Sequence, residues 1–150
     1  MSKTKPCIAV VDDETSVRTG LDSLLRAAGY HVVLFESGND FLASLFRGQL
    51  PDCVILDCAM PGLSGLDVVS IMTLDRIDVP AIMMSGHADA DLENRSIEAG
   101  ARTLLRKPFG ADQLFAAIES GLAQNAQAAR LRATGSSTQR AVSRMRSRRS

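Results

Sequence analysis

Five polar side chains stand at or just beyond the ends of short apolar segments, and their types favour chemistry on phosphate. Three are carboxylates, one is a hydroxyl and one is an ammonium group: Asp12, Asp13, Asp57, Ser85 and Lys107. Carboxylates that lie close together repel, and each shifts toward its protonated form unless a cation joins them. Oxygen ligands with partial exposure are typical of Mg²⁺, and the chain has no cysteine–histidine cluster that would favour zinc. The five side chains therefore predict a magnesium site that handles a phosphoryl group.

Each side chain has an expected role in phosphoryl transfer. A carboxylate can itself be the nucleophile and form an aspartyl-phosphate, and Asp57 is the central group of the five, so we expect it to be the acceptor. Mg²⁺ is expected on Asp13 and Asp57, with Asp12 as a direct or water-mediated ligand. Lys107 is expected to neutralise one phosphoryl oxygen, and Ser85 to donate a hydrogen bond to another.

Alternating strands and helices are needed to bring these side chains together. Short continuous apolar runs predict strands covered on both faces, at 7–11, 31–35, 52–57, 81–85 and 101–107. Apolar residues at helical spacing predict helices at 15–28, 39–46, 65–74, 89–99 and from about 112 onward, with Thr15 as the cap of the first and with Gly29 and Gly100 as helix ends. Five such units predict an α/β fold with a parallel sheet and helices on both of its faces. In an open sheet of this kind the ligand site lies at the carboxyl ends of the strands, where all five side chains would meet.

Composition and charge divide the chain into an acidic domain and a basic tail. The chain is 45% hydrophobic and 23% charged, which is ordinary for one globular domain. Residues 1–125 carry all 17 acidic residues and 10 basic ones, whereas residues 126–150 carry seven arginines and no acid. We therefore expect a domain at 1–125 and a basic tail at 126–150, mostly disordered beyond about Arg132 because it has few apolar residues to bury.

Membrane insertion and secretion are not expected. No apolar run is long enough to cross a bilayer, and the first residues lack the apolar core of a signal peptide. The three cysteines form no CxxC pair and cannot all be disulfide-bonded, which favours reduced thiols and a cytoplasmic location.

The basic tail has three possible roles. It is a solvated extension, an electrostatic anchor for nucleic acid, or a segment that docks on the acidic edge of its own or another copy of the domain. Binding of nucleic acid is disfavoured, because no aromatic residue is interleaved with the arginines for stacking and no helix-turn-helix pattern follows.

Four sequence segments together resemble the receiver domain of two-component response regulators. They are VVDDE (10–14), VILDCAMPGLSGLD (54–67), MMSGHAD (83–89) and LLRKPF (104–109), and the resemblance covers about 1–125. It implies a CheY-like, flavodoxin-like doubly wound fold with five parallel strands in the order 2-1-3-4-5. The short layout, without insertions, is most similar to receivers of the FixJ/NarL type.

The resemblance adds three residues to the predicted site. Besides matching Asp57 to the phosphoacceptor and Ser85 to the switch hydroxyl, it implies that the backbone carbonyl of Ala59 is a ligand of Mg²⁺. It also implies a cis peptide bond between Lys107 and Pro108. Leu104 stands where many receivers carry an aromatic switch residue, so the usual coupling between Ser85 and the output surface is not assured here.

The function that the resemblance implies is that of a phosphoacceptor in a two-component phosphorelay. A histidine kinase or a histidine phosphotransfer protein would donate the phosphoryl group to Asp57, and the domain would catalyse its own phosphorylation and dephosphorylation without being an enzyme for other substrates. The output would be altered binding of a protein partner, or homodimerisation, through the face formed by the fourth helix, the fifth strand and the fifth helix. We expect a single-domain regulator without a DNA-binding output domain.

Other functions of related folds fit the residues less well. An aspartate-nucleophile phosphatase needs a second acid two residues after the nucleophile, where this chain has Ala59, and it needs a cap domain. A flavin-binding electron carrier needs a hydroxyl-rich loop after the first strand, whereas Asp12, Asp13 and Glu14 would repel a phosphate there. A DNA-binding regulator would have to rely on the arginine tail alone.

Overall fold

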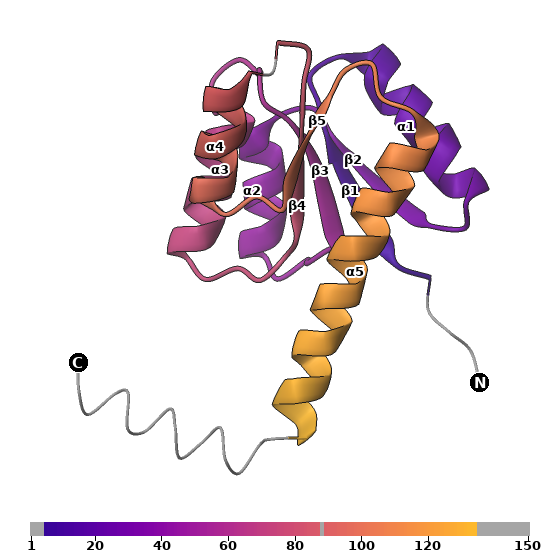
Figure 1. Cartoon of the computed structure of the whole chain (residues 1–150), viewed down its shortest axis with the longest axis vertical. Helices are drawn as coiled ribbons and strands as arrows, with labels where there is room; N and C mark the ends of the chain where they lie inside the picture. Colours follow the sequence, from indigo (N-terminus) through magenta and orange to yellow (C-terminus); the bar gives the residue numbers. More distant parts are fainter. Residues whose placement is uncertain (1–4, 88, 135–150) are drawn as a thin grey trace.

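Five parallel strands form the centre of the structure, in the order β2-β1-β3-β4-β5 (Figure 1). The computed structural model describes residues 5–87 and 89–134. The strands are β1 (Cys7–Val11), β2 (His31–Phe35), β3 (Cys53–Asp57), β4 (Ala81–Ser85) and β5 (Thr103–Arg106). The helices are α1 (Thr15–Ala27), α2 (Gly38–Phe46), α3 (Gly65–Leu74), α4 (Ala90–Ala99) and α5 (Ala111–Thr134). The predicted flavodoxin-like fold and its strand order are therefore confirmed.

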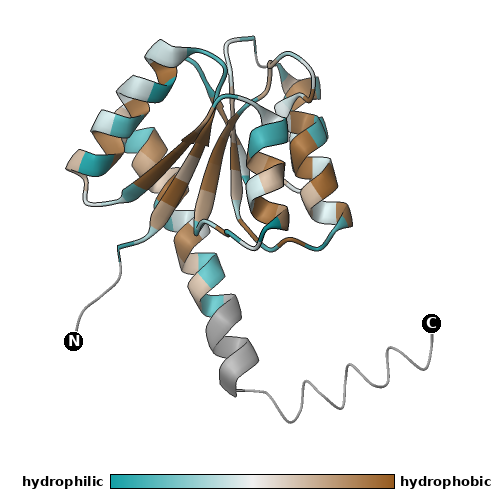
Figure 2. Cartoon of the chain, turned by 180° about the vertical axis from the view of Figure 1, so that it is seen from behind, coloured by the Kyte–Doolittle hydropathy of each residue, from teal (hydrophilic) through white to brown (hydrophobic). Residues whose placement is uncertain are grey.

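Helices cover both faces of the sheet and enclose two apolar layers. Successive side chains of a strand point to opposite faces, so Ile8 and Val10 of β1 pack toward α1 and α5, whereas Ala9 and Val11 pack toward α2 and α3. The inner strands β1, β3 and β4 are buried along almost their whole length, and Figure 2 shows the strands of the sheet mainly in the brown of apolar residues. This double burial explains why these strands are continuous apolar runs rather than alternating ones.

The helix starts are set by short polar side chains. Ser64 caps α3 in a reciprocal capping box with Asp67, and Ser37 and Asp89 cap α2 and α4 by accepting a backbone N–H. The predicted cap of α1 is wrong, since Thr15 is the first residue of the helix and follows Glu14, which makes no side-chain cap. The Thr15 hydroxyl instead accepts a hydrogen bond from Arg18.

The last strand is shorter than predicted, and the last helix crosses the predicted boundary between domain and tail. β5 is shorter than the predicted 101–107: Ala101 donates its N–H to Ser96 in the last turn of α4, and the strand ends at Arg106. Helix α5 continues to Thr134 and extends past the sheet, so the predicted boundary at 125/126 lies within it (Figure 1). The rest of the predicted basic tail, 135–150, lies outside the described residues.

Candidate functional site

The carboxyl ends of four strands bring the predicted side chains to one edge of the sheet. Asp12 follows β1, Asp57 ends β3, Ser85 ends β4 and Lys107 follows β5. Because β1, β3, β4 and β5 are consecutive neighbours and all parallel, their last residues lie side by side. The topology therefore places the predicted site where the sequence analysis expected it.

Three carboxylates form a compact cluster at this edge. Asp12, Asp13 and Asp57 each offer an oxygen atom, and these atoms all lie within 4.8 Å of one another. Asp12 and Asp57 are buried, at 0% and 4% exposed, whereas Asp13 is exposed. Three converging carboxylate oxygens, one of them open to solvent, fit a hard divalent cation that keeps part of its water shell.

Lys107 bridges the two buried carboxylates. Its Nζ lies 3.3 Å from Asp12 Oδ2 and 3.5 Å from Asp57 Oδ1. Burial lowers the pKa of Lys107, but the charges of Asp57 and Asp12 outweigh burial and raise it above the ordinary value. The ammonium group is therefore charged at neutral pH and partly compensates the two carboxylates.

Asp57 has a raised pKa. Burial is the largest cause and the charge of Asp12 adds to it, while Lys107 and a hydrogen bond from the Ala59 backbone N–H act in the opposite direction. The Ala59 N–H, two residues further along the chain, thus faces the Asp57 carboxylate. The role of the Ala59 carbonyl as a cation ligand stays a prediction.

The main chain around Asp57 is held on two sides. The Cys58 N–H donates to the carbonyl of Met84 at 2.8 Å, and the Gly65 N–H donates to the carbonyl of Cys58 at 3.1 Å. Gly65 approaches so closely that a Cβ atom there would lie 2.4 Å from the Asp57 carbonyl oxygen. Gly65 thus allows α3 to begin directly against the end of β3.

Ser85 is buried at the end of β4 and is linked to β5. Its carbonyl accepts the Lys107 N–H at 2.8 Å, and its hydroxyl oxygen accepts the His87 N–H at 3.1 Å. The hydroxyl group therefore belongs to the same edge as Asp57 and Lys107. Its predicted contact with a phosphoryl oxygen stays a prediction.

Leu104 and Pro108 lie on either side of Lys107. The peptide bond between Lys107 and Pro108 is cis, as the resemblance implied. Leu104 lies beside Met83 on the neighbouring strand and is buried in the apolar layer on the α2–α3 face. The side chain at the predicted switch position is thus part of the core.

Cys58 directly follows Asp57 and has an unreactive thiol. Burial and the neighbouring charge of Asp57 raise its pKa to about 11. A thiol with this pKa is almost entirely protonated at neutral pH and is a poor nucleophile. Cys58 therefore acts as a small buried apolar residue beside the acceptor.

The sequence analysis did not identify Arg18 as part of the site. Arg18 is only 8% exposed and lies in α1 at the spacing of the buried Leu21 and Leu25. Its Nη1 donates to the backbone carbonyl of Asp12 at 2.6 Å. A charged residue in line with an apolar stripe was the available signal, because such a residue needs a buried partner.

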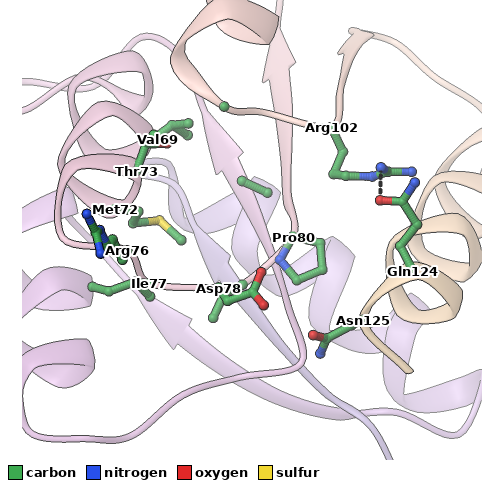
Figure 3. A pocket seen from close by; sticks show the side chains of 13 residues that line it. Val69, Met72, Thr73, Arg76, Ile77, Asp78, Pro80, Arg102, Gln124 and Asn125 are labelled. Atoms are coloured by element: carbon green, nitrogen blue, oxygen red, sulfur yellow. Dashed lines mark hydrogen bonds between the residues drawn. The ribbon is translucent and has the colours of Figure 1, made fainter. Parts of the chain in front are cut away.

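A large cavity lies at the opposite edge of the sheet. It has a volume of about 600 Å³ and lies where β4 and β5 begin, between α3 and α5. Figure 3 shows Arg102 beside this cavity, where its guanidinium donates to Gln124 of α5. Among the described residues that line the cavity there is none of the five predicted side chains, so the carboxylate edge remains the candidate site.

Comparison with known proteins identifies the class. A sequence model of the response regulator receiver domain matches residues 8–119. The chain is 39% identical over 127 residues to the transcriptional regulatory protein FixJ of Bradyrhizobium diazoefficiens, covering 85% of this chain and 62% of that protein. It is 37% identical over 122 residues to the response regulator protein TodT of Pseudomonas putida, covering 81% of this chain and 53% of that protein.

Solved structures agree with the sequence matches. The response regulator StyR superposes with a TM-score of 0.80 at 37% identity, covering 93% of this chain and 70% of that one. The structure titled FixJ-N gives a TM-score of 0.74 at 28% identity, covering 80% of this chain and 95% of that one. The chain belongs to the response regulator receiver domain family, and it contains the receiver domain of a two-component response regulator. It spans about half to three fifths of the length of the curated relatives named above.

Among the helices in the described part of the chain, none is long and apolar enough to cross a membrane.

Proposed function

We propose that this receiver domain takes a phosphoryl group onto Asp57 from the phosphohistidine of a histidine kinase or a histidine phosphotransfer protein. The observation that carries the proposal is the arrangement around Asp57. Its buried carboxylate lies in one cluster with Asp12 and Asp13 and 3.5 Å from the Lys107 ammonium. A nucleophilic carboxylate, a cation site and a fixed positive charge are the parts that phosphoryl transfer requires.

The cation of this site is proposed to be Mg²⁺, held by Asp13 and Asp57. The Asp12 oxygens are already engaged, one by the Glu14 N–H at 2.9 Å and the other by Lys107 at 3.3 Å. Asp12 is therefore better placed as a water-mediated ligand than as a direct one. When bound, Mg²⁺ supplies positive charge to the oxygens of the phosphoryl group.

Transfer forms one bond and breaks one. A carboxylate oxygen of Asp57 attacks the phosphorus atom, and the bond between phosphorus and the donor imidazole nitrogen breaks. The electron pair of that bond stays on the imidazole nitrogen. Lys107, whose raised pKa keeps it charged, is free to neutralise a phosphoryl oxygen once Asp57 has become an acyl phosphate.

The phosphorylated state ends by hydrolysis of the bond between phosphorus and the Asp57 oxygen. Water attacks the phosphorus atom, inorganic phosphate leaves and the Asp57 carboxylate is regenerated. The domain thus catalyses its own phosphorylation and dephosphorylation and has no separate substrate. A phosphohistidine donor of this kind works in the cytoplasm, which is where we infer that the chain acts.

The proposed output surface is the face formed by α4, β5 and α5, where a protein partner or a second copy would bind. Ser96 is the only buried residue of α4, while Ile97 of the same helix is 45% exposed. A helix held by few buried contacts has low local stability and is suited to move between two states. Ser85 and Lys107 connect the site to this face, because they close the ends of β4 and β5.

Beryllofluoride, a stable mimic of the phosphoryl group, tests the proposal in a calorimetric titration with Mg²⁺ present. Wild-type protein is expected to bind one equivalent, and Asp57→Ala none. Asp75→Ala, which removes an exposed carboxylate at the end of α3, is the matched control and should bind like the wild type. Absence of binding to the wild type, or undiminished binding to a folded Asp57→Ala protein, would overturn the proposed role of Asp57.

A further inference from the structure

The peptide unit that joins Asp12 to Asp13 is the backbone from which the exposed Asp13 side chain extends. Asp13 is joined to Asp12 by a peptide bond, and the carbonyl oxygen of Asp12 is part of that bond. Because the peptide unit is planar, fixing this oxygen fixes the orientation of the unit that carries the Cα atom of Asp13. The oxygen accepts a hydrogen bond from Arg18 Nη1 at 2.6 Å.

Arg18 is itself held firmly. Its guanidinium is buried, and Nη2 contacts the Thr15 hydroxyl at 3.1 Å and Glu36 Oε1 at 3.4 Å. A buried cation is stable only when such partners satisfy its N–H groups. The planar guanidinium therefore connects the start of α1 and the loop after β2 to the carbonyl of Asp12, with little freedom to rotate.

The direction of the expected effect separates positioning from simple electrostatics. Arg18 places a positive charge against the backbone of Asp12, a member of the carboxylate cluster, so charge alone means that its removal should strengthen binding of a cation. If Arg18 orients Asp13, its removal should weaken binding instead. The two possibilities predict opposite signs for the same measurement.

We propose that Arg18 is a positioning residue for the cation site, acting through the Asp12–Asp13 peptide bond on the carboxylate of Asp13. The proposal rests on the proposed function in one respect, namely that Asp13 is a ligand of Mg²⁺. It adds a residue of α1 to the machinery, although Arg18 itself contacts neither the cation nor the phosphoryl group.

The test is a Mg²⁺ titration of the full chain, followed by calorimetry or by amide chemical shifts. Arg18→Lys keeps the charge but loses the planar fork, and Arg18→Gln loses both. We expect the dissociation constant for Mg²⁺ to rise about tenfold in either variant, as is usual for the loss of a residue that orients a ligand. At saturating Mg²⁺ the rate of phosphorylation should stay within about twofold of the wild type, because excess Mg²⁺ fills the site even when it binds more weakly.

Two controls make the result specific to the Asp12 contact. Arg26→Lys changes another arginine of α1, whose guanidinium contacts Asp22 and the Val32 carbonyl instead of Asp12, so it should bind Mg²⁺ like the wild type. In a double-mutant cycle, Arg18→Lys should add little to the loss caused by Asp13→Asn, because both changes remove the same contribution.

The outcomes separate this proposal from the proposed function. If wild-type protein binds Mg²⁺ and a folded Arg18→Lys or Arg18→Gln protein binds it equally well or more tightly, the role of Arg18 is overturned while the site stands. Fully additive losses in the cycle would also overturn it, because Arg18 would then not act through Asp13. If the wild type itself binds no Mg²⁺, the proposed function and this inference both fail.

Discussion

Asp57 is the residue at which burial and function conflict. Its carboxylate lies 4% exposed beside that of Asp12, and the Lys107 ammonium compensates the pair only in part. The folded protein therefore holds a charge that burial disfavours, and a bound cation would reduce this cost. A pKa shifted by burial and by a neighbouring charge is common for reactive groups in functional sites.

Replacing the acceptor by its neutral isostere should therefore stabilise the protein. The pKa of Asp57 is raised by burial and by Asp12, so the folded state holds the Asp57 proton more tightly than the unfolded state does. Ionised Asp57 then lowers stability at every pH above its folded pKa, and this loss disappears as the pH falls below the ordinary value of 3.8. We therefore expect Asp57→Asn to raise the melting temperature at pH 7; for a domain of this size, a gain of about 1 kcal/mol corresponds to about 3–5 °C.

Thermal denaturation with a chelator present measures this difference. The gain should shrink as the pH is lowered toward 4, and Asp75→Asn should show no comparable gain. A melting temperature for Asp57→Asn below that of the wild type at pH 7 would show that the ion pair with Lys107 outweighs burial.

At the scale of elements, the site depends on how closely α3 approaches the end of β3. The N-terminal residue of α3 is Gly65, whose N–H donates to the carbonyl of Cys58 next to the acceptor. A side chain at this position would collide with the backbone of Asp57, which cannot move without moving the carboxylate. Gly65 is therefore needed for its lack of a Cβ atom rather than for a special backbone angle.

Gly65→Ala should consequently destabilise the domain and reduce phosphorylation. Forcing an atom into a packed region typically costs about 1–3 kcal/mol. Gly20→Ala is a matched control, because Gly20 lies within α1 and a Cβ there would meet nothing within 4 Å. The control should gain about 0.5–1 kcal/mol from improved helix propensity, so chemical denaturation should give opposite signs. Equal stability of the two variants would show that the contact at Gly65 is relieved at no cost.

The positions of strands and helices are predicted well from the sequence where burial of apolar side chains determines them. Each inner strand is an apolar run that stops at a polar side chain, and the parallel sheet then forces those side chains to one edge, which is why Asp12, Asp57 and Ser85 were placed correctly. The burial of Arg18 was missed, because the helix at 15–28 was predicted from its apolar residues alone, whereas Arg18 shares the buried line of α1 with Leu21 and Leu25. Thr15 was assigned as a cap from its type alone, although its hydroxyl serves Arg18.

At the scale of the whole molecule, α5 joins the acidic domain to the basic segment. Leu114 and Ile118 anchor the helix in the core, and the helix continues to Thr134. The division at 125/126 was based on charge and on the lack of apolar residues to bury. The sequence at 126–134 contains four alanines, however, and alanine favours helix without any burial.

The charge asymmetry of the chain also belongs to this scale. The seven arginines after residue 125 balance an excess of acids in the domain that includes the carboxylate cluster. Phosphorylation of Asp57 would add negative charge at the cluster edge. Attraction between this negative charge and the arginines would weaken as the salt concentration rises. Residues 135–150 lie outside the described part of the chain, so the three possible roles of the tail stay hypotheses.

Intact mass after incubation with a small phosphodonor and Mg²⁺, with acid quenching at short times, tests the central claim most directly. Wild-type protein and Asp75→Ala should each gain the mass of one phosphoryl group, and a chelator should abolish the gain. Asp57→Ala should gain nothing. Equal gain by Asp57→Ala, or a wild-type protein that stays unmodified with every small donor and every quenching time, would contradict Asp57 as the phosphoacceptor.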